Sequence, residues 1–317
     1  MKKTLFLSLC AVITSSCIHF YTQNPKRLTK GREDILVIAH RGASGYLPEH
    51  TLESVALAHG FDPDYIEPDL VVTRDDHLIV LHDIHLENNT NVEEIFPKRK
   101  RSDGRWYAID FSLNEIKKLS VHERTFEKGK VVFKNRFPLN KSSFKVPTFE
   151  EYIELIQGLN ASRGREIGIY PEIKAPAFHK SEGKDTISLL MKTLKKYNYH
   201  KENSRLFIQC FDPDFLKEFK RRYPSSSIKL VQLIADNSWK ESSHDYDVMR
   251  TKEGLSKVSE YAYAIGPWIP FVLKGDLIKD SHSHGLKVHV FTLRDKERLS
   301  ELIERGVDGV FTDFPDL

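Results

Sequence analysis

Residues Lys287–Leu293 (KVHVFTL), Lys296–Arg305 (KERLSELIER) and Gly309–Thr312 (GVFT) decide the fold class. The first and third segments are short, apolar and rich in β-branched residues, which is typical of buried strands. The middle segment is amphipathic and indicates a helix. A helix between two strands lets the chain cross back over the sheet, so the strands are expected to lie parallel in a βαβ unit.

The same rhythm runs through the rest of the chain. Two further helices are expected at Thr186–Tyr197 and Asp214–Arg222. About eight strands within ~250 residues favour a closed TIM-type (β/α)8 barrel over an open doubly wound sheet. No glycine-rich nucleotide loop opens a helix after the first strand, which weighs against the dinucleotide-binding alternative. The remaining expected strands are Ile35–Ala39, Tyr65–Thr73, Leu78–His82, Ile167–Lys174, Leu206–Phe211, Lys229–Ile234 and Tyr261–Gly266.

One short connection breaks this rhythm. Only residues 74–77 separate two of the expected strands, and a parallel crossover needs a dozen residues or more. These strands are therefore expected to form an antiparallel hairpin. If its turn centres on the middle of this segment, Asp69 faces His82 across the hairpin.

A long connection breaks the rhythm as well. Residues 84–148 are too many for an ordinary loop and predict a small subdomain inserted into the barrel. Between Pro97 and Thr148 there are 14 Lys and Arg residues against 5 Asp and Glu. This excess, densest at Lys98–Arg101, indicates either a solvated face or a positive field that draws anionic substrates toward a cleft. No aromatic stacking platform accompanies it, so nucleic acid is not an expected partner.

The first residues are expected to direct export. Two lysines precede the apolar run Leu5–Ile13, and small residues follow as far as Cys17. We therefore expect an export signal at 1–17 and the barrel at 18–317, with the protein periplasmic or lipid-anchored at the cell envelope. Cys17 is either the lipidated amino terminus, anchoring the protein to a membrane, or part of a discarded peptide. Cys210 lies in an apolar run and is expected to be a buried thiol.

The composition excludes two other classes of protein. The 317 residues include 19 Phe and 12 Tyr, with 48 basic against 45 acidic side chains, which excludes intrinsic disorder. Three cysteines are too few for a disulfide-stabilised scaffold. A folded globular protein is expected.

Carboxylates gather on two of the expected strands. Glu67 and Asp69 are two residues apart and share one strand face, and the hairpin brings His82 to the same patch. Glu172 and Lys174 repeat this spacing on a later strand. Such groups are often simply solvated or paired with neighbours. In a barrel, however, strand ends converge on one face, and three carboxylates there favour a bound cation, Ca²⁺ or Mg²⁺ rather than zinc.

The end of the first strand carries a third group. His40 and Arg41 are followed by Gly42 and Gly45. An arginine offers a fork of donors to phosphate oxygens, and the glycines let the backbone approach a ligand. A histidine at a strand end is more often structural than catalytic, but the three groups together favour chemistry.

Several stretches resemble the glycerophosphodiester phosphodiesterase family, most closely its exported bacterial branch. The resemblance covers nearly everything after about residue 35. Its main stretches are His40–Thr51 (HRGASGYLPEHT), Glu67–Leu70 (EPDL), Leu81–Asp83 (LHD), Tyr170–Lys174 (YPEIK) and Phe311–Asp316 (FTDFPD).

This resemblance implies a TIM-type barrel with an inserted subdomain and hydrolysis of glycerophosphodiesters to glycerol 3-phosphate and an alcohol. Pro68, between two of the implied metal carboxylates, departs from the pattern and removes one ladder N–H. The implied roles are general base and acid for His40 and His82, metal ligation, usually of calcium, for Glu67, Asp69 and Glu172, and phosphate contact for Arg41 and Lys174.

Two questions stay open at this point. The nucleophile is either water or the neighbouring hydroxyl of the substrate's glycerol. The alternatives to the implied function are a related phosphodiesterase that acts on intact phospholipids and a surface binding protein or antigen on an inactive barrel.

Overall fold

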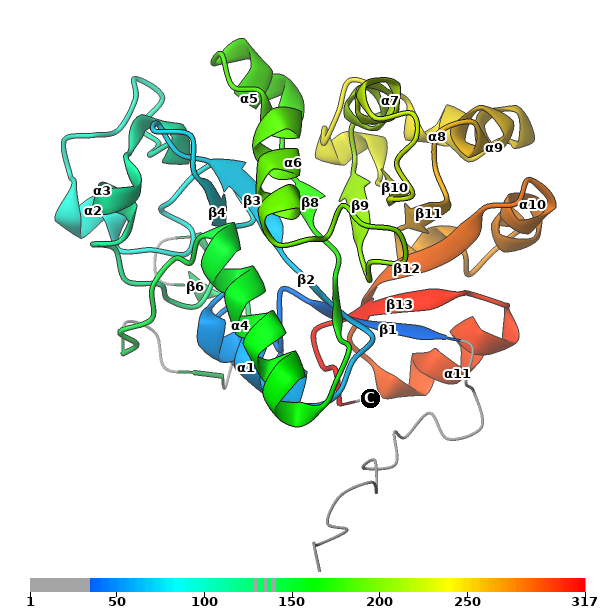
Figure 1. Ribbon diagram of the computed structural model, residues 1–317, viewed down its shortest axis with the longest axis horizontal. Helices are drawn as coiled ribbons and strands as arrows, with labels where there is room; N and C mark the ends of the chain where they lie inside the picture. Colours follow the sequence, from blue (N-terminus) through cyan, green and yellow to red (C-terminus); the bar gives the residue numbers. More distant parts are fainter. Residues whose placement is uncertain (1–34, 128–129, 134–135, 138–140, 317) are drawn as a thin grey trace, which may run out of the picture.

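A sheet that curls until its first and last strands meet forms the centre of the protein (Figure 1). The computed structural model describes residues 35–127, 130–133, 136–137 and 141–316. Strand β1 (Leu36–His40) pairs in parallel with β13 (Gly309–Thr312) on one side and with β2 (Tyr65–Glu67) on the other. The sheet continues through β7 (Gly168–Ile169), β8 (Glu172–Ile173), β9 (Phe207–Cys210), β10 (Lys229–Ile234), β11 (Ala264–Pro267) and β12 (Lys287–Leu293).

Two positions of the barrel are occupied by strands that are split at a proline. Pro68 separates β2 from β3 (Asp69–Val72), because proline has no N–H to donate to the ladder. Pro171 lies in the same way between β7 and β8. Since β2 pairs with β7 and β3 pairs with β8, each split strand fills one position, and the sheet closes as eight parallel positions. This confirms the predicted (β/α)8 barrel.

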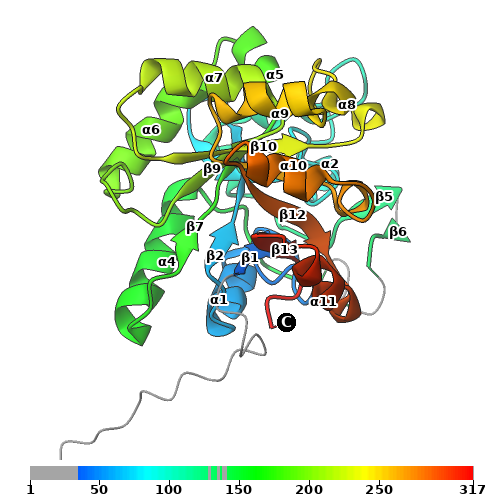
Figure 2. The same cartoon turned by 90° about the vertical axis from the view of Figure 1, so that its right-hand side faces the viewer.

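Helices cover the outside of the barrel and connect its strands (Figures 1 and 2). The longest is capped at both ends: Thr148 and Glu151 form a reciprocal capping box, and Gly164 ends the helix with φ of +61°. The helices are α1 (Leu52–Gly60), α4 (Phe149–Arg163), α5 (Pro176–Ser181), α6 (Thr186–Lys196), α7 (Pro213–Arg222), α8 (Tyr246–Met249), α9 (Lys252–Ser259), α10 (Leu277–Ser283) and α11 (Lys296–Glu304), with short 3₁₀ turns at Asn237–Trp239 and Ile269–Phe271. Among the described residues, no helix combines the length and apolarity needed to cross a bilayer.

The hairpin is antiparallel as predicted, but its register differs from the prediction by one residue. Strand β3 pairs with β4 (Leu78–Val80) around the three-residue loop 74–76, whose last residue has φ of +63°. A left-handed residue at the end of a three-residue loop adds a bulge and shifts the pairing. Asp69 therefore lies opposite Leu81, whose N–H donates to the Asp69 carbonyl at 3.0 Å, and His82 lies beyond the end of β4.

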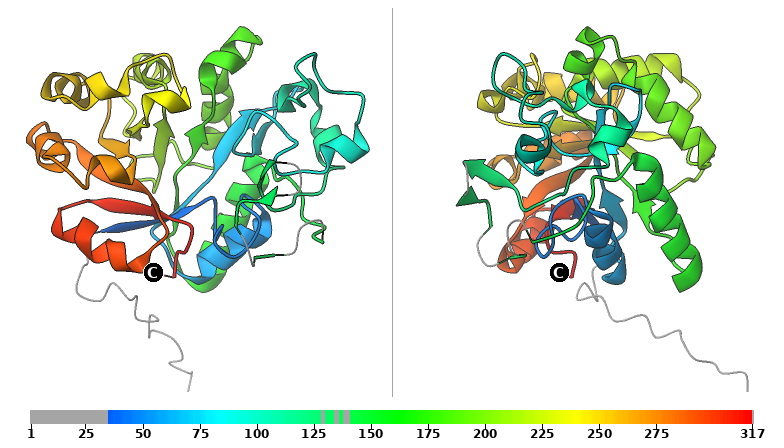
Figure 3. Two further views of the ribbon diagram at one scale, coloured as in Figure 1. Left: turned by 180° about the vertical axis from the view of Figure 1, so that it is seen from behind. Right: turned by 90° about the vertical axis from the view of Figure 1, so that its left-hand side faces the viewer.

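The segment between β4 and α4 has an apolar core of its own. Trp106 and Phe111 are buried there against Val71 and Ile79, which point away from the barrel core. Figure 3 shows the segment to one side of the barrel. Its elements are α2 (Val92–Ile95), a 3₁₀ turn (Ala108–Asp110), α3 (Leu113–Ile116), β5 (Thr125–Glu127) and β6 (Lys130–Val131).

Two arginines of the basic tetrad in this segment are paired with carboxylates. Arg99 donates to Glu115 at 2.8 Å. Arg101 bridges Asp110, at 2.8 Å, and Glu182 of the barrel, also at 2.8 Å. These ion pairs favour the interpretation of the basic tetrad as a solvated, structurally paired face.

We expect the Phe111→Ala substitution to lower the free energy of unfolding by about 3–5 kcal/mol. The reason is the cavity that it leaves in the apolar core of the segment between β4 and α4, the second core of the protein. The matched control is Ile95→Ala in the same segment, where the side chain is 44% exposed and the change is expected to stay within about 0.5 kcal/mol. Urea denaturation measures both values. Equal losses in the two variants would contradict the assignment of a packed second core.

Candidate active site

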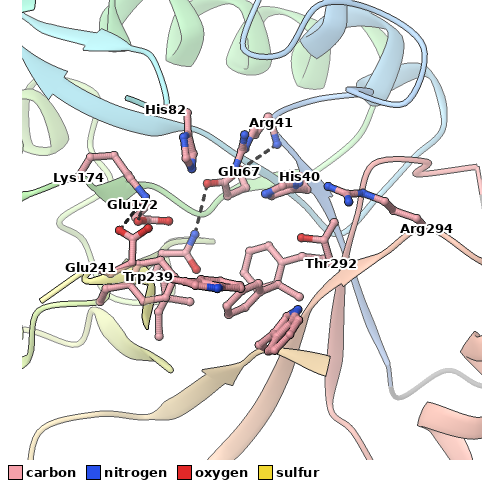
Figure 4. A pocket seen from close by; sticks show the side chains of 16 residues that line it. His40, Arg41, Glu67, His82, Glu172, Lys174, Trp239, Glu241, Thr292 and Arg294 are labelled. Atoms are coloured by element: carbon pink, nitrogen blue, oxygen red, sulfur yellow. Dashed lines mark hydrogen bonds and ion pairs between the residues drawn. The ribbon is translucent and has the colours of Figure 1, made fainter. Parts of the chain in front are cut away.

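The carboxyl ends of the barrel strands surround a cavity of about 390 Å³ (Figure 4). Six of the seven predicted site residues line it. The seventh, Asp69, is buried and contacts Arg41, one of the six. The structure thus brings all seven together. The six that line the cavity are His40, Arg41, Glu67, His82, Glu172 and Lys174.

Three buried carboxylates form the acidic side of the site. Glu67 and Asp69 flank Pro68 on one split strand, and Asp69 is the register partner of Glu172 on the next. One oxygen from each residue lies within 4.8 Å of the others. Burial, followed by the charges of the other two carboxylates, raises the pKa of Glu67 well above its usual range. Burial also raises the pKa of Glu172 to about 8.

This acidic cluster fits a hard divalent cation. The Oδ1 atom of Asp69 is buried and makes no hydrogen bond to the described residues. An all-oxygen donor set is what Ca²⁺ and Mg²⁺ prefer, whereas zinc prefers nitrogen and sulfur. A cation would also remove the mutual repulsion that raises the pKa of Glu67.

Two largely buried, positively charged side chains, those of Arg41 and Lys174, border the carboxylates. The backbone N–H of Arg41 donates to Glu67 at 2.8 Å, and its guanidinium lies 3.4 Å from Asp69 and 3.1 Å from Glu49. Burial opposes the charge of Arg41, but these carboxylates outweigh it and raise its pKa. Lys174 donates to Glu172 at 2.7 Å.

The loop after β1 has to turn sharply to place these groups. Arg41 has φ of +58° and Gly42 has φ of +81°. A Cβ atom on Gly42 would lie 2.4 Å from the Ser54 hydroxyl oxygen of α1, so only glycine fits there.

His40 is held by a carboxylate from the far end of the chain. Its Nδ1 lies 2.6 Å from Oδ1 of Asp313, which follows β13. Asp313 also accepts hydrogen bonds from Ser44 at 2.9 Å and from Arg294 at 2.6 Å. Although burial opposes ionisation, the hydrogen bond with His40 and the nearby positive charge of Arg294 lower the pKa of Asp313.

His82 is held in the same way by its neighbour in the chain. Its Nδ1 lies 2.6 Å from Oδ1 of Asp83, whose other oxygen accepts from Arg124 and Asn88, each at 2.7 Å. Interaction with His82 and Arg124 outweighs the effect of burial and lowers the pKa of Asp83.

These contacts define the protonation of both imidazoles. An ionised carboxylate can only accept a hydrogen bond, so the Nδ1 of each histidine carries the proton. In a neutral ring Nε2 is then the basic nitrogen. Burial, and then Arg41, lowers the pKa of His40, and burial with Arg41 and Lys174 lowers the pKa of His82 to about 3. Both rings are therefore neutral bases at neutral pH when no ligand is bound.

Aromatic side chains form the opposite wall of the cavity. The rings of Trp239 and Trp268 are 5.1 Å apart, and Phe291 lies 6.5 Å from Trp239. Trp239 is 43% exposed and lies across the cavity from His82 and Arg41 (Figure 4). The cavity thus offers one polar and one apolar side to a ligand.

The sequence interpretation missed the residues that position the predicted site residues through hydrogen bonds. Asp83 and Asp313 stand in the quoted stretches and directly follow His82 and β13, so their positions were available as signals. His50, whose Nε2 lies 2.8 Å from Asp69, was available in the same way. Nothing in the sequence pattern distinguishes Arg124 from its neighbours.

A closed α/β barrel whose strand ends join two histidines, three carboxylates and two buried cations is equipped to hydrolyse phosphate esters. Residues 40–317 match the model of the glycerophosphoryl diester phosphodiesterase family. The chain belongs to this family and is an enzyme that hydrolyses glycerophosphodiesters.

Individual relatives agree with this assignment. The glycerophosphodiester phosphodiesterase of Haemophilus influenzae is 42% identical, over 99% of this chain and 96% of its own. A solved structure from Silicibacter pomeroyi matches with a TM-score of 0.72 and 25% identity, over 89% of this chain and 90% of its own. An Oleispira antarctica phosphodiesterase, solved in complex with sn-glycerol-3-phosphate, matches with a TM-score of 0.64 and 23% identity, over 89% and 94% of the two chains.

We expect the cation-free protein to lose stability as the pH rises from about 7 to about 8. Folded Glu172 keeps its proton up to a pKa of about 8, whereas the unfolded chain releases it near the ordinary glutamate pKa of about 4.3. Below about pH 6.5 the lowered pKa values of His40 and His82 act in the opposite sense, because the unfolded chain then binds more protons at these residues. Above that pH the proton on folded Glu172 remains, and the free energy of unfolding falls as the pH rises. Added Ca²⁺ is expected to raise Tm more at about pH 8 than at about pH 6, because fewer protons compete with it.

Differential scanning fluorimetry with EGTA or Ca²⁺ measures both effects. The Glu172→Gln variant, which cannot ionise at this position, is expected to show a flatter dependence of Tm on pH. A Tm that rises between about pH 7 and pH 8 in EGTA would contradict the prediction.

Proposed function

We propose that glycerophosphodiester hydrolysis in this protein uses His40 as general base and His82 as general acid. Glu67, Asp69 and Glu172 hold a divalent cation, Ca²⁺ in the first place and Mg²⁺ as the alternative. The observation that carries the proposal is that both imidazoles, each held through Nδ1 by an ionised aspartate, share one cavity with Glu67 and Glu172, which cluster with the buried Asp69.

The positively charged side chains at the cavity wall suit a phosphodiester substrate. Its single negative charge repels nucleophiles, and Arg41 and Lys174 at the cavity wall offset that charge. A divalent ion held by Glu67, Asp69 and Glu172 would supply further neutralisation of the substrate's negative charge. The buried position of all these groups strengthens each interaction relative to water.

The substrate itself prepares the acid. Burial, and after it the positive charge on Arg41 and Lys174, lowers the pKa of His82. A phosphodiester anion bound beside them offsets this effect and raises the pKa of His82, so that it can carry the proton for the departing alkoxide. The neutral Nε2 of His40 accepts the proton of the nucleophile, which is water or the adjacent hydroxyl of the substrate's glycerol.

The other expected properties stay proposals. Export, the envelope location and lipidation of Cys17 depend on residues outside the described part of the chain. The product bound to the Oleispira phosphodiesterase supports glycerol 3-phosphate as the product here. The ion pairs of Arg99 and Arg101 in the basic segment support a small-molecule partner rather than nucleic acid.

We expect His40→Ala and His82→Ala each to lower kcat by roughly 10²–10⁴-fold, because each removes one proton-transfer group. Release of glycerol 3-phosphate from glycerophosphocholine by the protein without residues 1–17 measures this, with Ca²⁺ and with EGTA. His77→Ala serves as the control, since His77 is exposed directly before β4 and its loss should leave kcat unchanged.

Three results would overturn parts of the proposal. Full activity in EGTA would exclude the cation. An unchanged kcat in either histidine variant would exclude that residue's role. No release from several glycerophosphodiesters by a folded protein would favour intact phospholipids as substrate or an inactive, binding barrel.

A further inference from the structure

One arginine of the segment between β4 and α4 reaches the active site. Arg124 is only 13% exposed and binds two carboxylates of the barrel. Its Nη1 donates to Asp83 at 2.7 Å, and its Nη2 donates to Glu49 at 2.6 Å. Its Nε lies 3.1 Å from both Glu49 oxygens, so each of the three guanidinium nitrogens faces a carboxylate.

Each of these carboxylates leads to a group of the proposed reaction. The other oxygen of Asp83 holds Nδ1 of His82 at 2.6 Å. Glu49 accepts from Nη1 of Arg41 at 3.1 Å. Arg124 therefore joins the acid His82 and the phosphate-binding Arg41 through one chain of hydrogen bonds. It does not itself belong to the residues described as lining the cavity, so it acts through these two groups.

The charges of this network depend on Arg124. Glu49 is buried, which disfavours its charge, but Arg124 and then Arg41 lower its pKa well below the usual range. Without Arg124, two buried carboxylates would share too little positive charge, and the pair would rearrange or take up a proton. A protonated or displaced Asp83 no longer fixes the Nδ1–H tautomer of His82.

We propose that Arg124 is a positioning residue for the reaction. It sets the orientation of His82 and the place of Arg41 together, which makes the segment between β4 and α4 a working part of the active site. The proposal rests on the function proposed above for His82 and Arg41.

The first experiment compares Arg124→Ala with a matched control. Arg101 belongs to the same segment and also bridges two carboxylates, Asp110 and Glu182, but none of the site residues. Loss of alignment in Arg124→Ala is expected to lower kcat for glycerophosphocholine on the order of 10²-fold, with a smaller change in KM. Arg101→Ala is expected to lower Tm by a similar amount and leave kcat unchanged.

Two more variants separate positioning from general packing. Arg124→Lys keeps the charge but not the fork, so it should restore Tm more than kcat. In a double-mutant cycle with Asp83→Asn, the combined variant should lose little more activity than the worse single variant, because both changes break one chain of contacts. Effects on kcat that multiply, or an equal loss of kcat in Arg101→Ala, would overturn the proposal.

A readout without turnover keeps this test separate from that of the reaction. The Nδ1–H proton of His82, hydrogen-bonded to Asp83, should give a downfield NMR resonance that disappears in His82→Ala. We expect it to shift or broaden in Arg124→Ala and to persist in Arg101→Ala. An unchanged resonance in Arg124→Ala would overturn the positioning role even if the wild-type protein hydrolysed no glycerophosphodiester.

Discussion

Mutual repulsion among three buried carboxylates is the constraint on which the rest of the site depends. Oxygens of Glu67, Asp69 and Glu172 lie within 4.8 Å of one another, a separation at which two full charges repel by about 3 kcal/mol at an effective dielectric constant of 20. The surrounding structure supplies compensation at short range: the backbone N–H of Arg41, the ammonium of Lys174 and the imidazole of His50. The strained turn at Arg41 belongs to this compensation, because it aims the N–H at Glu67.

The barrel accommodates this cluster with little loss of hydrogen bonds between its strands. Both split strands break next to a carboxylate of the cluster, Pro68 between Glu67 and Asp69, and Pro171 before Glu172. A proline has no N–H that would be left unpaired where the ladder is interrupted. The carbonyl of Pro68 still accepts from Glu172 at 2.9 Å, and that of Pro171 from Gln209 at 3.0 Å. The strands can therefore change neighbours at the depth of the cluster without burying an unsatisfied donor.

Strand parity and barrel topology were enough to predict which residues meet. Alternation along a strand placed Glu67 beside Asp69, and convergence of strand ends placed Glu172 and His40 near them. The hairpin register was wrong by one residue, because the left-handed conformation of Asp76 adds a bulge that periodicity does not reveal. His82 nevertheless lines the same cavity as Glu67 and Glu172. Because β4 ends at Val80, the position of His82 does not depend on the register of the hairpin.

Two long-range contacts of the supporting residues were beyond such reasoning for a different reason. The contact between His40 and Asp313 spans 273 positions, and that between Arg124 and Glu49 spans 75. Contacts of this kind depend on how loops from separate elements fold over the barrel mouth, which composition and periodicity do not encode. Cys210 lies in an apolar run of the sequence, and it was correctly predicted to be a buried thiol.

The closure of the barrel by β13 has a consequence for the synthesis of the protein. The strand that seals the sheet against β1 is followed at once by Asp313, so the carboxylate that holds His40 directly follows the last strand of the barrel. A growing chain that has not yet reached Gly309 has neither β13 nor the carboxylate that holds His40. We therefore expect a product shortened before Gly309 to be inactive, although it would contain nearly the whole barrel.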